Sequence, residues 1–321
     1  MSYGLWRKRG HKIKITKIKN SHRRKFLKLL YWALSIVGIL SGFFFSACAL
    51  QRCVVFPRCF VRDQSFRGNR YPGMQRLWIS TPQGKVEAWF VPARKHAADE
   101  SPGTLSPARA QSGPKQKDKD KAKVIRKPAV IYAHGNAELI DHSNSVVHGY
   151  TRMGVHVMLC EYRGYGRSAG APSQKRIVAD FVKCRDRLSS FPEVDPDRVF
   201  YHGRSLGTGV VSGLARKRKP AALVLEAPFV SVAAMMAKYF IPRVFVLDPF
   251  DNLEVLKKFK GPVLLLHGNQ DRVIPFSHSQ KLHQVAKEST LKEYTWGHNN
   301  FIYGRQYWND VKVFLQRNRI L

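Results

Sequence analysis

The chain has 321 residues, of which 55 are Lys or Arg and 22 are Asp or Glu, so its formal net charge is +33 at pH 7. With 44% hydrophobic and 12% aromatic residues it contains enough apolar material for a packed core, which excludes a wholly disordered polymer. Its five cysteines include no closely spaced pair such as C-x-x-C, which disfavours a disulfide scaffold or a zinc ribbon.

Two segments are strongly basic, and the second is also poor in large apolar residues. Residues 1–28 hold eleven Lys or Arg and no acid, and form a basic N-terminal arm. Residues 93–127 carry ten bases and four acids among Pro, Gly and Ser, a composition typical of a disordered insert. The rest of the chain keeps a net charge of +16 and should attract anionic surfaces or substrates. No helix-turn-helix, zinc-finger or aromatic-interleaved basic pattern occurs, so we expect no specific nucleic-acid binding.

Residues 29–50 form a run of 22 residues without a charged side chain. As a helix the run would be about 33 Å long, enough to cross a hydrocarbon layer about 30 Å thick. We therefore expect a transmembrane anchor with the lipid bilayer as partner, and the small residues Ala47-Cys48-Ala49 leave a cleaved signal or a lipoprotein as alternatives. Nine Lys or Arg lie within 20 residues before the run and five within 20 after it, which predicts a cytosolic N-terminus and an extracytoplasmic domain.

A membrane-proximal segment, 51–73, should lead into a folded domain at 74–321. Two short strands, 74–80 and 85–91, open the domain as a hairpin because the residues between them are turn formers. Beyond the insert, continuous apolar runs alternate with helical stretches; the runs are 129–133, 155–159, 199–201, 222–225 and 263–266, and the helices 174–188, 206–218 and 276–287. Runs without polar alternation suit strands buried on both faces, so we expect an α/β fold, a mostly parallel sheet with helices on both faces.

Two pentapeptides fit the pattern G-x-S-x-G, one around Ser168 and one around Ser205. A nucleophile elbow needs a strand that runs directly into the serine and a helix that leaves it. Ser205 meets both conditions. Ser168 lies several residues beyond its strand, and Pro172 prevents a helix from starting immediately after it. The sequence therefore predicts Ser205 as the nucleophile and Ser168 as a loop residue, and a side chain at Gly203 or Gly207 should collide with neighbouring backbone.

A serine nucleophile needs a base and an acid, and in strand-turn-helix hydrolases they follow in the order Ser, acid, His. Asp271 comes just after the buried strand 263–266, and His298 just after the probable last strand, 291–295. Loops at the carboxyl ends of parallel strands present side chains to one crevice, so we expect Asp271 to orient His298 and His298 to act as base.

Several alternatives to this assignment remain open. Asp271 is alternatively a loop carboxylate or a helix cap, and His298 a surface histidine. Other candidate acids are Asp248 and Asp251. Three further histidines are less suitable by position, one in a strand-end turn and two in a helix: His267, His278 and His283.

The chemistry also requires donors for a developing oxyanion, and backbone N–H groups can be fixed in advance for that purpose. We expect one N–H from Leu206, which follows the nucleophile, and one from Asn136, in the loop after strand 129–133. His134 in that loop should shape it rather than react. No metal or organic cofactor is required.

The connection 228–260 is short for a full lid, which implies a shallow, open site. Its apolar side chains line an acyl pocket or pack onto the sheet, and the sequence favours neither; they are Met235, Met236, Tyr239, Phe240, Ile241, Val244, Phe245 and Val246.

Taken together the motifs resemble the α/β-hydrolase superfamily, and within it the BEM46-like group that includes palmitoyl-protein thioesterases of the ABHD17 type. The matching motifs are HGNA at 134–137, EYRGYGRS at 161–168, HGRSLG at 202–207, HGNQD at 267–271 and GH at 297–298. The resemblance covers about residues 74–320 and implies the roles of nucleophile, acid and base for Ser205, Asp271 and His298. The chain departs from the family pattern in its basic insert and in Glu161, where Asp is common.

These observations predict a membrane-anchored serine hydrolase that cleaves carboxylic ester or thioester bonds through an acyl-enzyme. Its substrate would be a small-molecule or lipid-linked acyl compound. A serine peptidase of the same fold is one alternative, because members of the superfamily include peptidases. The other is a catalytically silent, membrane-anchored binding protein with a basic surface.

Overall fold

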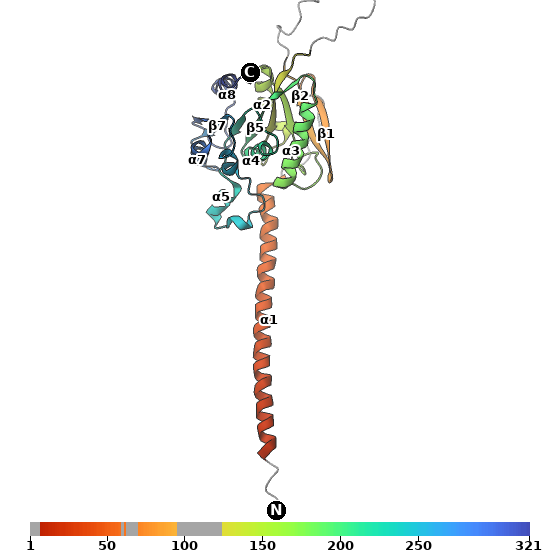
Figure 1. Ribbon diagram of the computed structural model, residues 1–321, viewed down its shortest axis with the longest axis vertical. Coiled ribbons are helices and arrows are strands. Elements are labelled where there is room, and N and C mark those ends of the chain that lie inside the picture. Colours follow the sequence, from red (N-terminus) through yellow and green to blue (C-terminus); the bar gives the residue numbers. More distant parts are fainter. Residues whose placement is uncertain (1–6, 59–60, 62–69, 95–123) are drawn as a thin grey trace, which may run out of the picture. The chain divides into compact units, whose positions relative to one another are not determined.

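The computed structural model describes residues 7–58, 61, 70–94 and 124–321 (Figure 1). Most of the predicted insert, at 95–123, lies outside the described residues. The backbone alone is described at 7–22, 40, 43–45 and 47–50. The chain divides into two compact units, Met1–Gln51 and Arg52–Leu321, and each is treated by itself.

The first unit consists mainly of helix α1 (Arg7–Val55), whose last residues belong to the second unit. The helix carries the predicted anchor, 29–50. Over the residues that the structure describes, no helix is both long enough and apolar enough to span a bilayer, and eight side chains of 29–50 are outside that set. The described large apolar side chains of the run are exposed, among them Leu29, Leu30, Tyr31, Trp32, Leu34, Ile36, Val37 and Ile39.

The second unit is built on one eight-stranded sheet in the order β1-β2-β4-β3-β5-β6-β7-β8. The strands are β1 (Gln75–Thr81), β2 (Gly84–Val91), β3 (Lys127–Ala133), β4 (His156–Cys160), β5 (Val194–Arg204), β6 (Leu223–Glu226), β7 (Val263–Gly268) and β8 (Ser289–Tyr294). Pairs β1/β2 and β2/β4 are antiparallel and all others are parallel. The predicted opening hairpin and the mostly parallel sheet are confirmed.

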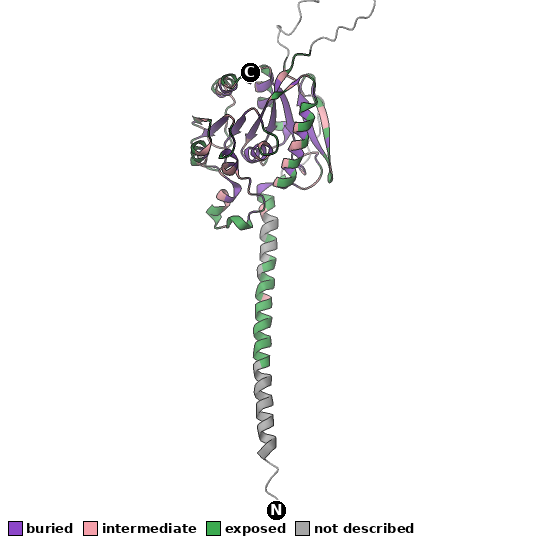
Figure 2. Cartoon of the chain, viewed as in Figure 1, coloured by how far each residue is buried: buried purple, intermediate pink, exposed green. Residues whose placement is uncertain are grey.

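Helices cover both faces of the sheet, as its buried strands require (Figures 1 and 2). In β3 alternate residues serve two hydrophobic clusters, with Ile131 on one side and Val130 on the other. The first cluster takes apolar side chains from α3 (Gln174–Ser189), α4 (Leu206–Ala215) and α7 (Ser277–Val285). The second takes them from α2 (Asn144–Arg152) and α8 (Arg305–Arg317).

The start of the second unit packs onto its core. Phe56 is buried and meets the ring of Phe250 edge to face, with ring centroids 6.1 Å apart. Arg52 Nε donates to Asp248 Oδ2 over 3.2 Å. These contacts join the segment 52–56 to the connection between β6 and β7.

That connection contains α5 (Val232–Met236), two short 3-10 turns (Ala237–Tyr239 and Arg243–Phe245) and α6 (Asn252–Leu256). Of the apolar side chains for which the sequence allowed a pocket or a packing role, Met235, Met236 and Ile241 pack against the core. Tyr239, Phe240 and Val244 do not pack onto the sheet, because they are exposed.

Helix α4 lies very close to the middle of the sheet. A side chain on Gly207 would overlap the carbonyl oxygen of Ala133 in β3, and one on Gly203 would overlap the carbonyl of Gly207. Both neighbours are backbone atoms, which cannot turn aside as the tip of a side chain can. The expected collision at both glycines is confirmed, and the reason is this helix–strand contact.

We predict that Gly207→Ala lowers the free energy of unfolding by about 1–3 kcal/mol, the range for overpacking a well-packed site. The matched control is Gly304→Ala, where an added methyl would meet only Ile302, at an ordinary 3.6 Å. Urea unfolding followed by circular dichroism measures both variants. Equal stability of the two would show that α4 can move away from β3.

Candidate active site

Ser205 forms the whole turn between β5 and α4, because β5 ends at Arg204 and α4 begins at Leu206. Its backbone has φ 50° and ψ −117°, a region that residues with a side chain rarely adopt. Hydrogen bonds hold it there: the Ser205 N–H donates to the Glu226 carbonyl over 2.8 Å, and the Thr208 hydroxyl donates to the Ser205 carbonyl over 2.7 Å. The backbone therefore presents Oγ above the carboxyl edge of the sheet.

His298 lies in the loop after β8, with Nε2 3.0 Å from Ser205 Oγ. Its Nδ1 lies 2.7 Å from Oδ2 of Asp271, and Asp271 lies in the loop after β7. A carboxylate can only accept a hydrogen bond, so we assign the proton of His298 to Nδ1, which donates to Asp271. The lone pair of Nε2 then faces the serine hydroxyl. The structure thus brings the three sequence-predicted residues into one hydrogen-bonded chain.

The groups around Asp271 stabilise its ionised form. Its Oδ1 accepts the backbone N–H groups of Val273 and Ile274, each over 2.8 Å. Burial acts to raise the pKa of Asp271, but hydrogen bonds from His267, His298 and the Ile274 N–H outweigh it and hold that pKa well below its usual range. The negative charge that orients His298 is therefore present throughout the physiological pH range.

His267 is a positioning residue that the sequence placed in a turn after the strand. It lies within β7 and is fully buried. Its Nε2 faces two acceptors, Asp271 Oδ2 at 3.2 Å and the Ile274 carbonyl at 2.9 Å, while Nδ1 lies 2.6 Å from Ser279 Oγ. The ring thus joins the acid loop to helix α7.

The alternative acids and bases have other partners. Asp248 accepts the first N–H of α3 over 2.7 Å, and Asp251 is the N-cap of α6. His278 accepts the N–H of Val230 over 3.0 Å, and the ring of His283 lies 2.7 Å from a serine hydroxyl of β8. Each of the four therefore has a structural role of its own.

Ser168 lies in the loop between β4 and α3, as predicted. Its Oγ accepts the N–H of Glu87 in β2 over 2.9 Å, and its own N–H donates to the Tyr165 carbonyl over 2.8 Å. The second G-x-S-x-G serine is buried and links the loop to the sheet.

The predicted oxyanion donors are the N–H groups of Asn136 and Leu206. Within the described part of the chain, neither of them donates a hydrogen bond to another protein group. The loop that carries Asn136 is shaped by His134, whose ring nitrogens lie 2.8 Å from the Gly135 carbonyl and 2.8 Å from Glu161 Oε1. The interpretation of His134 as a loop-shaping residue is confirmed.

Arg204, next to the nucleophile, joins the loops of the site, and sequence reasoning missed it. Its Nη2 donates to the His298 carbonyl over 2.9 Å, and its Nη1 forms an ion pair with Glu138. Glu138 in turn accepts the Gly135 N–H over 3.0 Å. One guanidinium thus connects the base loop to the loop of the predicted oxyanion donor.

The partner of Arg204 inside the sheet is Glu226, the last residue of β6. Arg204 Nε donates to it over 3.0 Å, and the hydroxyls of Tyr303 and Tyr307 donate over 2.9 and 2.8 Å. Burial acts to raise the pKa of Glu226, but His202, whose Nε2 lies 3.6 Å away, and the charge of Arg204 outweigh it and lower that pKa. The signal in the sequence is a charged residue placed directly after an apolar run.

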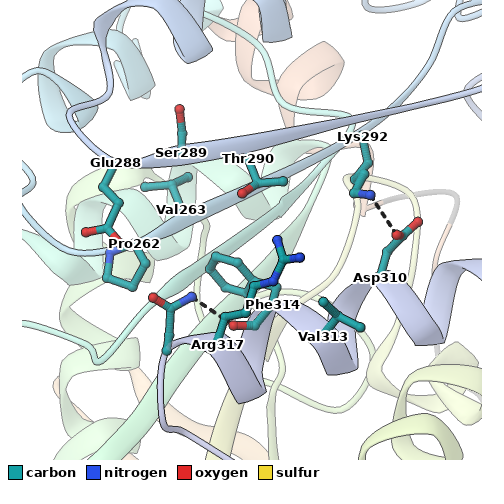
Figure 3. A pocket seen from close by; sticks show the side chains of 11 residues that line it. Pro262, Val263, Glu288, Ser289, Thr290, Lys292, Asp310, Val313, Phe314 and Arg317 are labelled. Atoms are coloured by element: carbon teal, nitrogen blue, oxygen red, sulfur yellow. Dashed lines mark hydrogen bonds and ion pairs between the residues drawn. The ribbon is translucent and has the colours of Figure 1, made fainter.

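A cavity of about 260 Å³ lies between β8 and α8 (Figure 3). Pro262, Val263 and Ser289 line it, and Lys292 pairs with Asp310 over 2.9 Å at one side. Pro262, Val263 and Ser289 lie at the amino ends of β7 and β8. By contrast, Ser205, Asp271 and His298 follow the carboxyl ends of their strands. Ligands of open α/β sheets bind at the carboxyl ends, so this cavity is not the candidate substrate site.

Comparison with solved structures gives the fold. The chain superposes on the esterase Pf2001 of Pyrococcus furiosus with a TM-score of 0.58 and 18% identity, over 81% of this chain and 97% of that one. It superposes on Est1E from Butyrivibrio proteoclasticus with a TM-score of 0.56 and 17% identity, over 77% of this chain and 99% of that one. Both likenesses show an α/β-hydrolase fold.

Comparison with sequences gives the family. A family model described as serine aminopeptidase, S33, matches residues 125–249. An uncharacterized protein of Mycobacterium tuberculosis is 35% identical over 203 residues, which are 60% of this chain and 72% of that protein. The human α/β hydrolase domain-containing protein 17B is 30% identical over 200 residues, which are 60% of this chain and 68% of that protein. The chain therefore belongs to the α/β-hydrolase superfamily and, within it, to the ABHD17-type group.

Proposed function

We propose that this protein is a membrane-anchored serine hydrolase that cleaves carboxylic ester or thioester bonds of acyl substrates. The observation that carries the proposal is the chain of hydrogen bonds from Ser205 Oγ through His298 to Asp271, with distances of 3.0 and 2.7 Å. This is the arrangement by which a weak hydroxyl nucleophile is activated.

In the proposed reaction Ser205 Oγ attacks the acyl carbonyl carbon while its proton passes to His298 Nε2. The carbonyl π electrons move to oxygen, and the N–H groups of Leu206 and Asn136 hold the oxyanion. Collapse of the intermediate expels the alcohol or thiol, which takes the proton from His298. Water, activated by the same histidine, then hydrolyses the acyl-enzyme and regenerates Ser205.

A serine peptidase is the second candidate, because the matching family model carries the description serine aminopeptidase. The structural neighbour Pf2001 is an esterase, which favours ester substrates. Turnover of p-nitrophenyl acyl esters against aminoacyl anilides separates the two. Faster turnover of the anilides would favour the peptidase.

The anchor in this proposal is the apolar run 29–50 of α1. Its described large apolar side chains are exposed to solvent along the helix, which suits contact with lipid. The excess of Lys and Arg before the run favours a cytosolic N-terminus and an extracytoplasmic hydrolase unit.

We predict that Ser205→Ala lowers kcat by about 10³-fold or more, because it removes the covalent step, while the protein stays folded. The control is Ser168→Ala, which loses a buried hydrogen bond to β2 but should keep most of the activity. Hydrolysis of p-nitrophenyl acetate and circular dichroism measure both. The reverse pattern, activity in Ser205→Ala and none in Ser168→Ala, would contradict the assignment.

We also predict that Arg204→Lys lowers kcat by about 10- to 100-fold with a smaller change in KM. A single ammonium cannot hold Glu226, Glu138 and the His298 carbonyl together, so the base and oxyanion loops lose alignment. The control is Arg218→Lys, which alters an exposed pair with Asp186. Steady-state kinetics and melting curves measure both, and a kcat unchanged by Arg204→Lys would rule out this positioning role.

The proposed topology predicts that protease on the cytosolic face of sealed vesicles removes residues 1–28 and leaves the hydrolase unit intact. Vesicles opened with detergent are the control, in which both parts are digested. Immunoblots against the two ends of the chain report the result. Cleavage within 93–127 from the cytosolic face would show that the topology is wrong.

A further inference from the structure

Three large apolar side chains project into solvent from the connection between α5 and α6, which we name the exposed loop, residues 237–246. Tyr239 is 74% exposed, Phe240 94% and Val244 82%, and the segment after α5 is coloured exposed in Figure 2. Phe240 also adopts φ 57°, a left-handed conformation that is unusual for a bulky residue. The backbone thus directs an aromatic ring away from the protein at a cost in strain.

The exposed loop is fastened to the domain at both ends. Before it Met235 and Met236 pack against the core, and within it Ile241 does so too. At its end Val246 is buried. The backbone that carries the projecting side chains is therefore anchored to the core at both ends. Over the described part of the chain these side chains form an exposed apolar patch.

The same loop carries the cations Lys238 and Arg243, of which Arg243 is 67% exposed and pairs with Asp251 over 2.9 Å. Aromatic and apolar side chains beside Lys and Arg suit the interface of an anionic bilayer, where the rings enter the headgroup layer and the cations meet lipid phosphates. The net charge of +16 outside the arm and insert has the sign that such a surface attracts. Charge and apolar character therefore point to the same partner.

The chain just beyond the exposed loop contacts the first residue of the hydrolase unit. Asp248, two residues beyond the loop, pairs with Arg52 over 3.2 Å. Arg52 follows the apolar run 29–50 by two residues, which span at most about 7 Å. The exposed loop is therefore linked, through Asp248, to the residue with which the hydrolase unit begins.

The exposed loop is also linked to the candidate active site. The N–H of Ser205 donates to the Glu226 carbonyl, and five residues separate Glu226 from α5. On the other side His278 accepts the N–H of Val230, and its neighbour Ser279 contacts His267, which holds Asp271. Ser205 and Asp271 are thus each linked, by a short chain of hydrogen bonds and backbone, to the segment that leads into the exposed loop.

We propose that the exposed loop seats on an anionic bilayer and that the enzyme takes acyl groups embedded in that bilayer as substrates. The inference rests on the proposed function, since it assigns the substrate class of the same site. The loop draws the site to the lipid surface, so that an acyl chain leaving the bilayer meets Ser205 without first crossing water.

The test uses the full chain in vesicles of phosphatidylcholine and phosphatidylserine at a ratio of 7:3. The variant Phe240→Ser/Val244→Ser removes two exposed apolar side chains, and Trp78→Ser, on the edge strand β1, is the control for loss of an exposed ring. Soluble p-nitrophenyl acetate and p-nitrophenyl palmitate carried in the vesicles are the two substrates. We expect the double variant to lose at least about tenfold in kcat/KM on the palmitate and little on the acetate, and Trp78→Ser to lose neither.

A second measurement does not depend on activity. Phe240→Trp in the same vesicles should show tryptophan quenching by brominated lipids beyond that of the native chain, because the added indole lies at the interface. Unchanged palmitate turnover in the double variant, or no added quenching in Phe240→Trp, would overturn the inference. If the native chain does not hydrolyse the acetate, the proposed function is overturned. The quenching result would still decide whether the loop contacts the bilayer.

Discussion

The contact between α4 and strands β3 and β5 is the constraint on which the candidate site depends. With no side chain at Gly203 or Gly207, the helix reaches the backbone of Ala133. Only at that separation does a single residue, Ser205, connect strand to helix, and its φ of 50° follows from the sharp turn. The hydrogen bond from its N–H to Glu226 then fixes the nucleophile against the neighbouring strand. Strain at one residue is offset by packing around it.

Parallel strand direction brings the remaining parts to the same edge. The loops after β3, β7 and β8 carry Asn136, Asp271 and His298, and all three leave carboxyl ends. The loops after β7 and β8 are tied to each other, since the Gln270 N–H donates to the Trp296 carbonyl over 3.1 Å. Arg204 links the β8 loop to the β3 loop. The site is thus held by contacts between loops as well as by the strands beneath them.

Local patterns in the sequence were enough to predict the sheet and the three hydrogen-bonded residues. The continuous apolar runs identify buried strands, and the position of Ser205 between a strand and a helix separates it from Ser168. Asp271 and His298 follow strands in the expected order. Each of these inferences uses residues within a few positions of one another, where backbone geometry limits the possibilities.

The features that the sequence did not predict depend on residues far apart along the chain. Arg204 and the His298 carbonyl are 94 positions apart, and Glu226 and Tyr307 are 81 apart, so no short motif contains both partners. His267 gains its role only when β7 and the loop after it fold together. For Tyr239, Phe240 and Val244 the sequence allowed either a place in an acyl pocket or packing onto the sheet, because large apolar side chains are normally covered. Their exposure is set by the backbone of the turn after α5.

The central claim is that Ser205 is an activated nucleophile, and a fluorophosphonate probe tests it most directly because the probe reacts covalently with activated serines. The folded, full-length protein is treated with the probe, digested, and the modified peptide is identified by mass spectrometry. We expect one adduct, on Ser205, that disappears in His298→Ala. An adduct on Ser168, or none on protein shown to be folded, would contradict it.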